Sequence, residues 1–325
     1  MKTKTKEPKQ VKIVNGKRQE NIWKRFWDTK FLFALFLPAL VYYLVFKYYP
    51  MWGISLAFFN YKPLLGLKGS PFIGFRNFTI FFKSPNFIPY CWNTLVLGIQ
   101  SLCISFPLTV FFALLLNEVR NMKFKKAVQT ISYMPHFMST VVIVSLIRTL
   151  CDPTNGAINL IIQALGGESI FFLMEAEWFR PLYLISGIWQ GIGWGTIIYL
   201  AAIAGVDPGL YEAARLDGAG RWRQMWNITL PSIAPTVSTM LIMKVGAVFG
   251  ASMEKVLLMQ QPATYETSQV LETYVYQVGI ISGQYSTSIA IGLFSNLINL
   301  ILMVLPNMPT FSLKYIPILL KINLR

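Results

Sequence analysis

The sequence has few charged residues for its length. Asp, Glu, Lys and Arg together make up 13% of its 325 residues, about half of their share in an ordinary soluble domain. Hydrophobic residues make up 54%, and the mean hydropathy is +0.49. This composition excludes a disordered chain and a soluble nucleic-acid-binding domain, and it argues against a soluble enzyme. We therefore expect the chain to fold in a lipid bilayer.

Histidine and cysteine are also scarce. The three cysteines, Cys91, Cys103 and Cys151, are scattered through apolar stretches and fit neither a disulfide framework nor a metal site. The single histidine, His136, follows Pro135, and we interpret it as a structural residue where proline frees backbone carbonyls. With no paired acids in the apolar stretches, we expect no catalysis by this chain, no metal and no cofactor of its own.

Six uncharged or nearly uncharged stretches are long enough to cross a membrane, which takes about 20 residues. A helix satisfies its own backbone hydrogen bonds in lipid, whereas an open strand does not. The sequence therefore predicts an all-α integral membrane protein with about six transmembrane helices. The predicted spans are Phe31–Phe46, a span within Ser84–Asn117, Ala127–Ile147, Pro181–Val206, a span within Gln224–Met253, and a span within Thr273–Leu313 near Ile289–Leu305.

The positive charges predict the orientation of these spans. The net charge is +15, and Lys and Arg gather in residues 1–30 and after the second, fourth and sixth spans. Because cytoplasmic loops carry the excess of Lys and Arg, both termini are expected to be cytoplasmic. We read residues 1–30 as a basic tail with an interfacial amphipathic helix over 19–30, and residues 31–305 as the transmembrane domain. Residues 306–325 form an apolar, basic tail with no assigned role.

A polar stretch on the predicted cytoplasmic side, Asp207–Pro231, connects the fourth and fifth spans. Asp207 is a helix N-cap residue, with Pro208 in the first turn. Gly218 permits a sharp turn, and a second short helix is expected over Trp222–Thr229. The pattern predicts an amphipathic helix–turn–helix exposed to the cytoplasm. Such a segment is either a docking surface for another protein or an ordinary connecting loop.

This segment resembles the EAA signature of the permease subunits of binding-protein-dependent ABC importers. The matching positions are Glu212-Ala213-Ala214, then Gly218 after three residues, and Ile228-x-Leu230-Pro231 after nine more. Other stretches resemble the sugar permeases of this family, namely the branch of the larger maltose permease and its polysaccharide and oligosaccharide subgroup, with alginate importers among them. They are IWQGIGWGTIIYLAAIAGVDPGLYEAA, GSPFIGFRNF, ISYMPHFMS and LETYVYQVGIISGQYSTSIAIGLF. The large outside domain of some maltose-type permeases is missing.

The resemblance implies an assembly in a bacterial cytoplasmic (inner) membrane. It comprises a heterodimer with a second permease, two cytoplasmic ATPase subunits that bind ATP and Mg, and an extracytoplasmic solute-binding protein. No nucleic acid is implied. The EAA segment would be the coupling helix that docks in a cleft of the ATPase. The residues expected at this contact are Glu212, Ala213, Ala214, Asp217 and Gly218.

Lys244 is the first candidate for the solute path, because an ionisable residue inside a span is usually functional. It suits a saccharide that carries carboxylates, or else it bonds to backbone carbonyls or to an acid of the partner permease. Gly187, Gly191 and Gly195 form a small-residue ridge that favours close helix packing. Alternatively, Gly191 belongs to the sugar path with Trp194, as the matching positions do in the maltose permease. The expected path residues are Lys244, Gly187, Trp189, Gln190, Gly191 and Trp194, with Asn93 and Tyr199 as further candidates.

The leading interpretation is therefore one permease subunit of an ATP-driven importer of oligosaccharide or polysaccharide, with an acidic, alginate-like solute favoured. The alternative is a secondary transporter or channel driven by an ion gradient. That class needs an internal repeat and an ion or proton site, and the sequence shows no repeat. A membrane scaffold without transport is the third interpretation, and sequence alone does not separate it from the first.

Overall fold

The computed structural model describes residues 13–14, 17–18 and 30–304. The predicted interfacial helix over 19–30 and the tail 306–325 therefore lie outside the described residues, apart from Lys30. The chain divides into two units, Met1–Ser55 and Leu56–Arg325. This division falls within the stretch 31–305 that the sequence treats as one domain.

The first unit contains the first predicted span. A short antiparallel hairpin precedes it. Its strands, β1 (Ile13–Val14) and β2 (Lys17–Arg18), have two residues each. Helix α2 (Lys30–Tyr43) continues through the π-helical turn η1 (Leu44–Tyr48) into η2 (Tyr49–Phe58), which extends into the second unit. Together they give 29 apolar helical residues, enough to cross a membrane. The span thus lies where the sequence predicts it and runs further.

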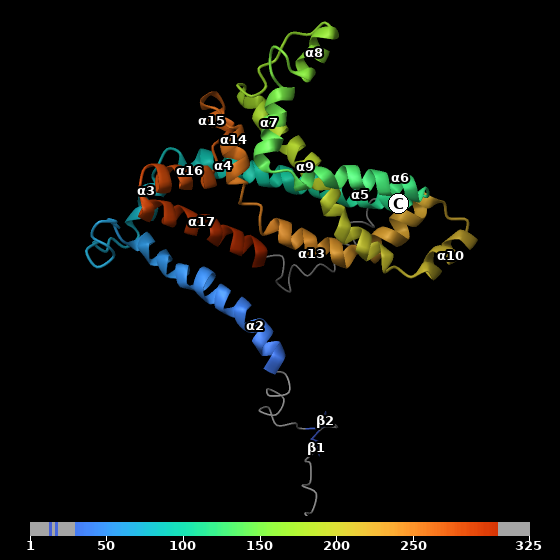
Figure 1. The fold of residues 1–325 in the computed structure, drawn as a ribbon, viewed down its shortest axis with the longest axis horizontal. Coiled ribbons are helices and arrows are strands. Elements are labelled where there is room, and N and C mark those ends of the chain that lie inside the picture. Colours follow the sequence, from blue (N-terminus) through green and yellow to red (C-terminus); the bar gives the residue numbers. More distant parts are fainter. Residues whose placement is uncertain (1–12, 15–16, 19–29, 305–325) are drawn as a thin grey trace, which may run out of the picture. The chain divides into compact units, whose positions relative to one another are not determined.

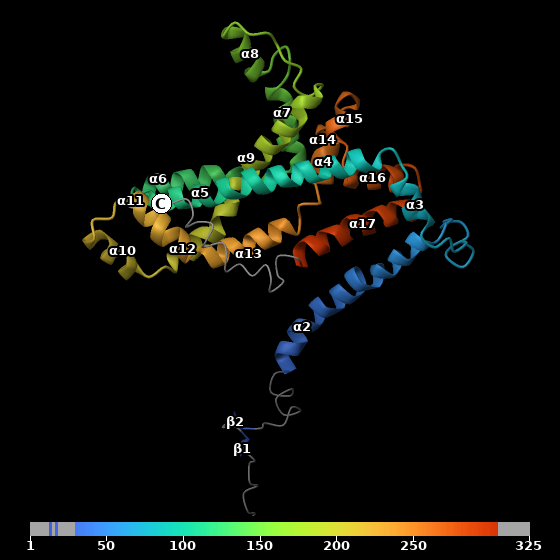
Figure 2. The same cartoon turned by 180° about the vertical axis from the view of Figure 1, so that it is seen from behind.

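Three more long apolar helices belong to the second unit (Figures 1 and 2). The first, Phe87–Glu118, is built from α4 (Phe87–Gln100), the π-helical turn η3 (Ser101–Ser105) and α5 (Phe106–Glu118). The others are α9 (Ala176–Ala204) and α17 (Tyr285–Val304). They correspond to the second, fourth and sixth spans expected from the sequence.

The third and fifth predicted spans are each a pair of bent helices. Helices α6 (Met122–Tyr133) and η4 (Met134–Phe137) meet α7 (Thr140–Leu150) at 103°. Helices α11 (Arg221–Gln224), η5 (Met225–Thr229) and α12 (Leu230–Ser232) meet α13 (Ala234–Val245) at 64°. Pro135 and Pro235 lie next to these bends, where a proline removes a backbone donor and crowds the preceding turn. The described residues thus contain four long spans, or up to six if each bent pair counts as one, in agreement with the predicted helical fold.

Shorter elements occupy the ends of the second unit. Figures 1 and 2 show α10 at one end and α3 at the opposite end, with α5 and α6 side by side and α9 crossing them. The short elements are α3 (Arg76–Phe82), α8 (Ala157–Ala164), α10 (Pro208–Leu216), α14 (Met253–Met259), η6 (Pro262–Thr264), α15 (Tyr265–Ser268), α16 (Leu271–Tyr276) and η7 (Gln277–Ile281).

Close helix packing around α9 fixes the geometry of the site. A Cβ added at Gly193 would overlap the Ser132 carbonyl of α6, and one added at Gly195 would lie 2.7 Å from Cγ2 of Thr109 on α5. These contacts confirm the packing interpretation for Gly195. On the side toward α10, buried apolar side chains of α5, α9 and the η5–α12 segment complete this core; they include Val110, Leu114, Tyr199, Met225 and Ile233.

Candidate solute cavity and coupling segment

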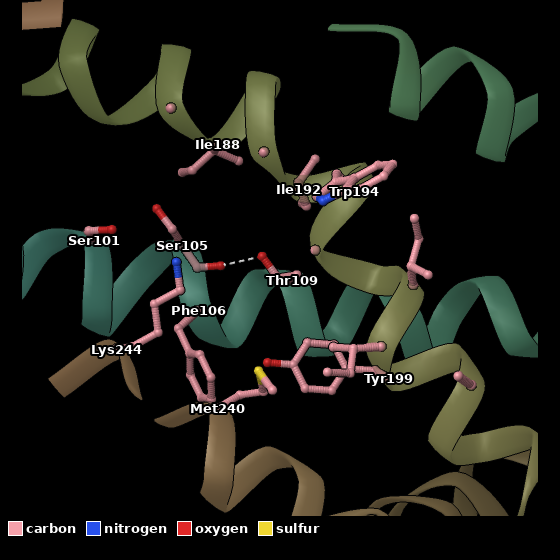
Figure 3. Close-up of a pocket in the computed structure, with 16 residues that line it drawn as sticks. Ser101, Ser105, Phe106, Thr109, Ile188, Ile192, Trp194, Tyr199, Met240 and Lys244 are labelled. Atoms are coloured by element: carbon pink, nitrogen blue, oxygen red, sulfur yellow. Dashed lines mark hydrogen bonds between the residues drawn. The ribbon is translucent and has the colours of Figure 1, made fainter. Parts of the chain in front are cut away.

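A cavity of about 590 Å³ lies between the η3–α5 segment, α9 and α13 (Figure 3). Its volume is within the range of small-molecule sites in proteins. Gly187, Gly191, Trp194 and Lys244, four of the residues expected on the solute path, line it. The structure therefore brings together residues from two helices that the sequence identified separately.

One wall of the cavity is a row of hydroxyl side chains, Ser101, Ser105 and Thr109. They recur every four residues, so they share a helix face. Thr109 Oγ1 donates to the Ser105 carbonyl at 2.7 Å (Figure 3). Ser101 and Ser105 bound the π-helical turn η3, and Pro107 follows it. Such a turn frees backbone groups inside a span and often occurs at functional sites.

The opposite wall is α9, where the glycine ridge changes character along its length. Gly195 packs against Thr109, but a Cβ added at Gly191 would meet nothing within 4 Å. Trp194 is exposed, and its ring stacks on His136 with centroids 4.6 Å apart. The ridge thus combines close helix packing at one end with open space at Gly191.

Lys244 is the charged side chain among the described residues that line the cavity. It lies in the last turn of α13, where the helix dipole favours a positive charge. Its side chain is exposed, and Figure 3 shows it reaching from α13 toward Ser105. A second hollow of about 200 Å³, lined by Tyr183 and Gly250 among others, shares Lys244 and Ser101 with the first. Lys244 therefore lines both hollows.

Three other candidates lie elsewhere. Trp189 is not on the cavity wall, and Gln190 Nε2 donates to the Met138 carbonyl at 3.4 Å. Asn93 is buried, and its amide nitrogen donates to the carbonyls of Glu266 and Gln269 while its oxygen accepts from Arg180. Asn93 thus serves as an internal brace between these segments.

The sequence analysis missed the hydroxyl row on the cavity wall and the stacking of His136 on Trp194. The four-residue spacing of Ser101, Ser105 and Thr109 within an apolar run was the available signal. It also missed Lys255 of α14, which is 5% exposed. Lys255 Nζ donates to the Tyr183 carbonyl at 3.1 Å and lies 4.9 Å from the centre of that ring.

Two buried ionisable groups lie beyond the cavity, outside the candidate spans. Burial lowers the pKa of the Lys255 ammonium to about 8, because an apolar environment disfavours its charged form. Burial likewise raises the pKa of the Glu272 carboxyl to about 7. One oxygen of Glu272 has no hydrogen-bond partner among the described residues. Burial thus favours the neutral forms of both the Lys255 and the Glu272 side chain.

The EAA segment forms helix α10 followed by a turn. The Asp207 side chain accepts a hydrogen bond from Gly209 N at 2.9 Å, which confirms the predicted N-cap. Gly218 has φ +74°, a conformation that glycine adopts without strain. Glu212, Ala213 and Asp217 are exposed, and Ala214 is partly buried. The helix therefore presents an acidic residue and small residues on an accessible surface.

Residues 105–308 match the family described as the inner membrane component of binding-protein-dependent transport systems, and the chain belongs to this family. It is therefore a non-catalytic membrane subunit of a transport complex. Membership also decides against the alternative of an ion-gradient-driven transporter or channel.

Individual relatives describe this class of transport proteins more closely. The chain is 47% identical over 295 residues to the polygalacturonan/rhamnogalacturonan transport system permease protein YteP of Bacillus subtilis, covering 91% of this chain and 92% of the relative. It is 45% identical to protein LplB of the same organism, covering 84% and 86%. It resembles a chain of a bacterial ABC transporter involved in import of the acidic polysaccharide alginate, with TM-score 0.82, 39% identity and coverage of 89% and 97%. A second crystal structure, of an alginate ABC transporter in complex with an alginate pentasaccharide-bound periplasmic protein, gives TM-score 0.82, 37% identity and coverage of 90% and 99%.

Proposed function

We propose that this chain is the permease subunit of an ATP-driven importer of uronate-containing oligosaccharide or polysaccharide. The assignment of an acidic solute depends on Lys244. This residue is a cation on the wall of a cavity that is otherwise lined by uncharged side chains. The names of the relatives support it, because polygalacturonan and alginate are polymers of sugar acids.

Each wall of the cavity has a role in this proposal. The Lys244 ammonium donates charge-assisted hydrogen bonds to a sugar carboxylate. Ser101, Ser105 and Thr109 exchange hydrogen bonds with sugar hydroxyls. The exposed Trp194 offers an aromatic face on which a sugar ring stacks, and Gly191 leaves room for it. The second permease covers the remaining side of the path.

The segment Asp207–Pro231 is the proposed coupling helix on the cytoplasmic side. Glu212 pairs there with a basic residue of the ATPase, while Ala213 and Ala214 permit close approach. Gly218 allows the turn, and Asp217 flanks it. The partner ATPase subunits bind ATP and Mg, and their closure moves α10 and the helices attached to it. The cavity then alternates between two discrete packings of its helices.

Uptake by the reconstituted complex tests the acidic solute class. The solute-binding protein is supplied with a uronate pentasaccharide or with a neutral pentasaccharide, and uptake is compared for Lys244→Met and for Lys68→Met, an exposed lysine away from the cavity. Loss of a hydrogen bond to a charged group costs about 1.5–3 kcal/mol. We expect Lys244→Met to lower uronate uptake at least tenfold and to spare neutral uptake, with Lys68→Met unchanged. An equal loss for both solutes would refute the role of Lys244.

A further inference from the structure

A third hollow, of about 780 Å³, lies away from the solute cavity. Its walls are the end of α5, the turn that leads to α6, helix α10 and the start of α11. It is therefore formed where the polar end of the α4–α5 span meets the EAA segment.

The charges on this hollow are predominantly positive. Arg120, Arg215 and Arg221 line it, against one acid, Glu118. Arg221 Nε is 2.8 Å from the Glu118 carboxylate, and another nitrogen of the same guanidinium donates to the Glu118 carbonyl. Within residues 30–304 the Arg120 and Arg215 side chains make no hydrogen bond or ion pair. The acid is thus already neutralised, and two guanidinium groups remain available.

Hydrogen bonds hold the walls in place. Gln224 is buried, and its Nε2 donates to the Ala219 carbonyl at 2.7 Å. The Tyr211 hydroxyl of α10 lies 2.9 Å from Thr229 Oγ1. Together with the Arg221–Glu118 pair, these contacts tie α10, α11 and the end of α5 to one another. The hollow is therefore a built feature of the fold and not a gap beside a loose loop.

Aromatic side chains indicate the depth of the hollow in the membrane. Trp222 and Trp226 are exposed, four residues apart, next to the lining residue Arg221. Exposed tryptophans at the end of a span mark the level of the lipid headgroups. Phe124, also exposed, lies among the basic residues at the start of α6. These aromatic residues therefore favour a position of the hollow near the lipid headgroups.

We propose that this hollow binds the phosphodiester headgroup of an anionic phospholipid. Guanidinium groups match phosphate oxygens with two parallel hydrogen bonds, which ammonium groups do not. Basic pockets between transmembrane helices on the cytoplasmic side suit such headgroups. The assignment of this site to the inner leaflet rests on the proposed function, which places α10 on the cytoplasmic side. The lipid-binding site itself does not depend on that placement.

Lipid binding to the purified transport complex tests the proposal. The complex is delipidated in detergent, and phosphatidylglycerol, phosphatidylcholine or inorganic phosphate is added while bound lipid is measured by native mass spectrometry. The variant Arg120→Gln/Arg215→Gln is compared with Lys123→Gln/Arg223→Gln, which removes the same charge from exposed positions outside the hollow. We expect phosphatidylglycerol to bind about tenfold more weakly to the first variant and within twofold of the wild type to the second.

Three outcomes would overturn the proposal. Equal phosphatidylglycerol binding by both double variants would show that the arginines of the hollow are not used. Inorganic phosphate that binds as tightly as the lipid would make this a site for a free anion. Release of the ATPase subunits by Arg120→Gln/Arg215→Gln, with lipid binding intact, would make the hollow a protein contact. Because the readout is bound lipid, failure of the proposed saccharide uptake would leave the result interpretable.

Discussion

The solute cavity draws its walls from three helical segments that are far apart in the sequence, whereas the EAA segment is one continuous stretch. In the cavity, small and hydroxyl side chains of η3, α5 and α9 lie against Lys244 of α13. In the EAA segment, a capped helix and a glycine turn expose an acid and small residues. The difference matches the proposed division of labour, in which packed helices shape the solute path and a local, exposed motif docks on the ATPase.

The largest expected effect comes from the exposed motif. Glu212→Lys with Gly218→Val reverses the charge that is proposed to face the ATPase and places a β-branched residue at φ +74°. We expect the ATPase subunits to be lost on purification and uptake to fall about a hundredfold or more, as measured by co-purification and by solute uptake.

The chain offers a matched control for this variant. Glu168 is exposed, and Gly166 has φ +86° with nothing within 4 Å of an added Cβ. Glu168→Lys with Gly166→Val therefore makes the same kinds of change in another loop, and it should retain the ATPase subunits. Equal loss of these subunits in both variants would mean that α10 has no special place in assembly.

The packed helices should show a steric effect of intermediate size. In Gly193→Ala the new methyl overlaps the Ser132 carbonyl, so α9 and α6 must separate, at a cost of about 1–3 kcal/mol. In Gly191→Ala the methyl meets open space. We expect the thermal unfolding midpoint of the detergent-solubilised complex to fall by several degrees for Gly193→Ala and to stay unchanged for Gly191→Ala. Similar midpoints for the two variants would contradict the packing described for α9.

The smallest effect concerns pH. The pKa of Glu272 is raised to about 7 by burial, so the folded state binds its proton more tightly than the unfolded state does. Stability should therefore fall as pH rises from about 4.5 to 7 and then level off, by at most about 3 kcal/mol. Glu272→Gln should remove this decline in the unfolding midpoint, whereas Glu212→Gln on the exposed helix should keep it. The Tyr183 hydroxyl and the Cys91 thiol face Glu272 and are unchanged in both variants.

Local features could be predicted from the sequence with good accuracy. The N-cap Asp207, the helix after it and the turn at Gly218 follow from residues that are neighbours in the chain, and the structure contains each of them. Apolar runs likewise located the four long spans and the two bent helix pairs. The bends in the third and fifth spans were not predicted, because a hydropathy pattern reports length and composition but not the direction in which a helix continues after a proline.

The cavity was only partly predictable. Lys244 was identified because a charge inside a span is costly, yet nothing in the sequence shows that Ser105 lies opposite it. Lys255 illustrates the reverse case, since it sits in a polar stretch and is nevertheless buried against Tyr183. Trp189 and Trp194 are both tryptophans of α9, and helical geometry alone directs one of them to the cavity wall.

The sequence by itself determined the solvent of this protein, the apolar stretches that form its candidate spans and the chemistry of its EAA segment. These depend on composition and on contacts between neighbouring residues. Only the tertiary structure decided which hydroxyls, glycines and aromatic rings surround Lys244, and which arginines share a hollow beside α10. The physical reason is that side chains on different helices meet through the packing of whole helices, and the close approaches at Gly193 and Gly195 set that packing.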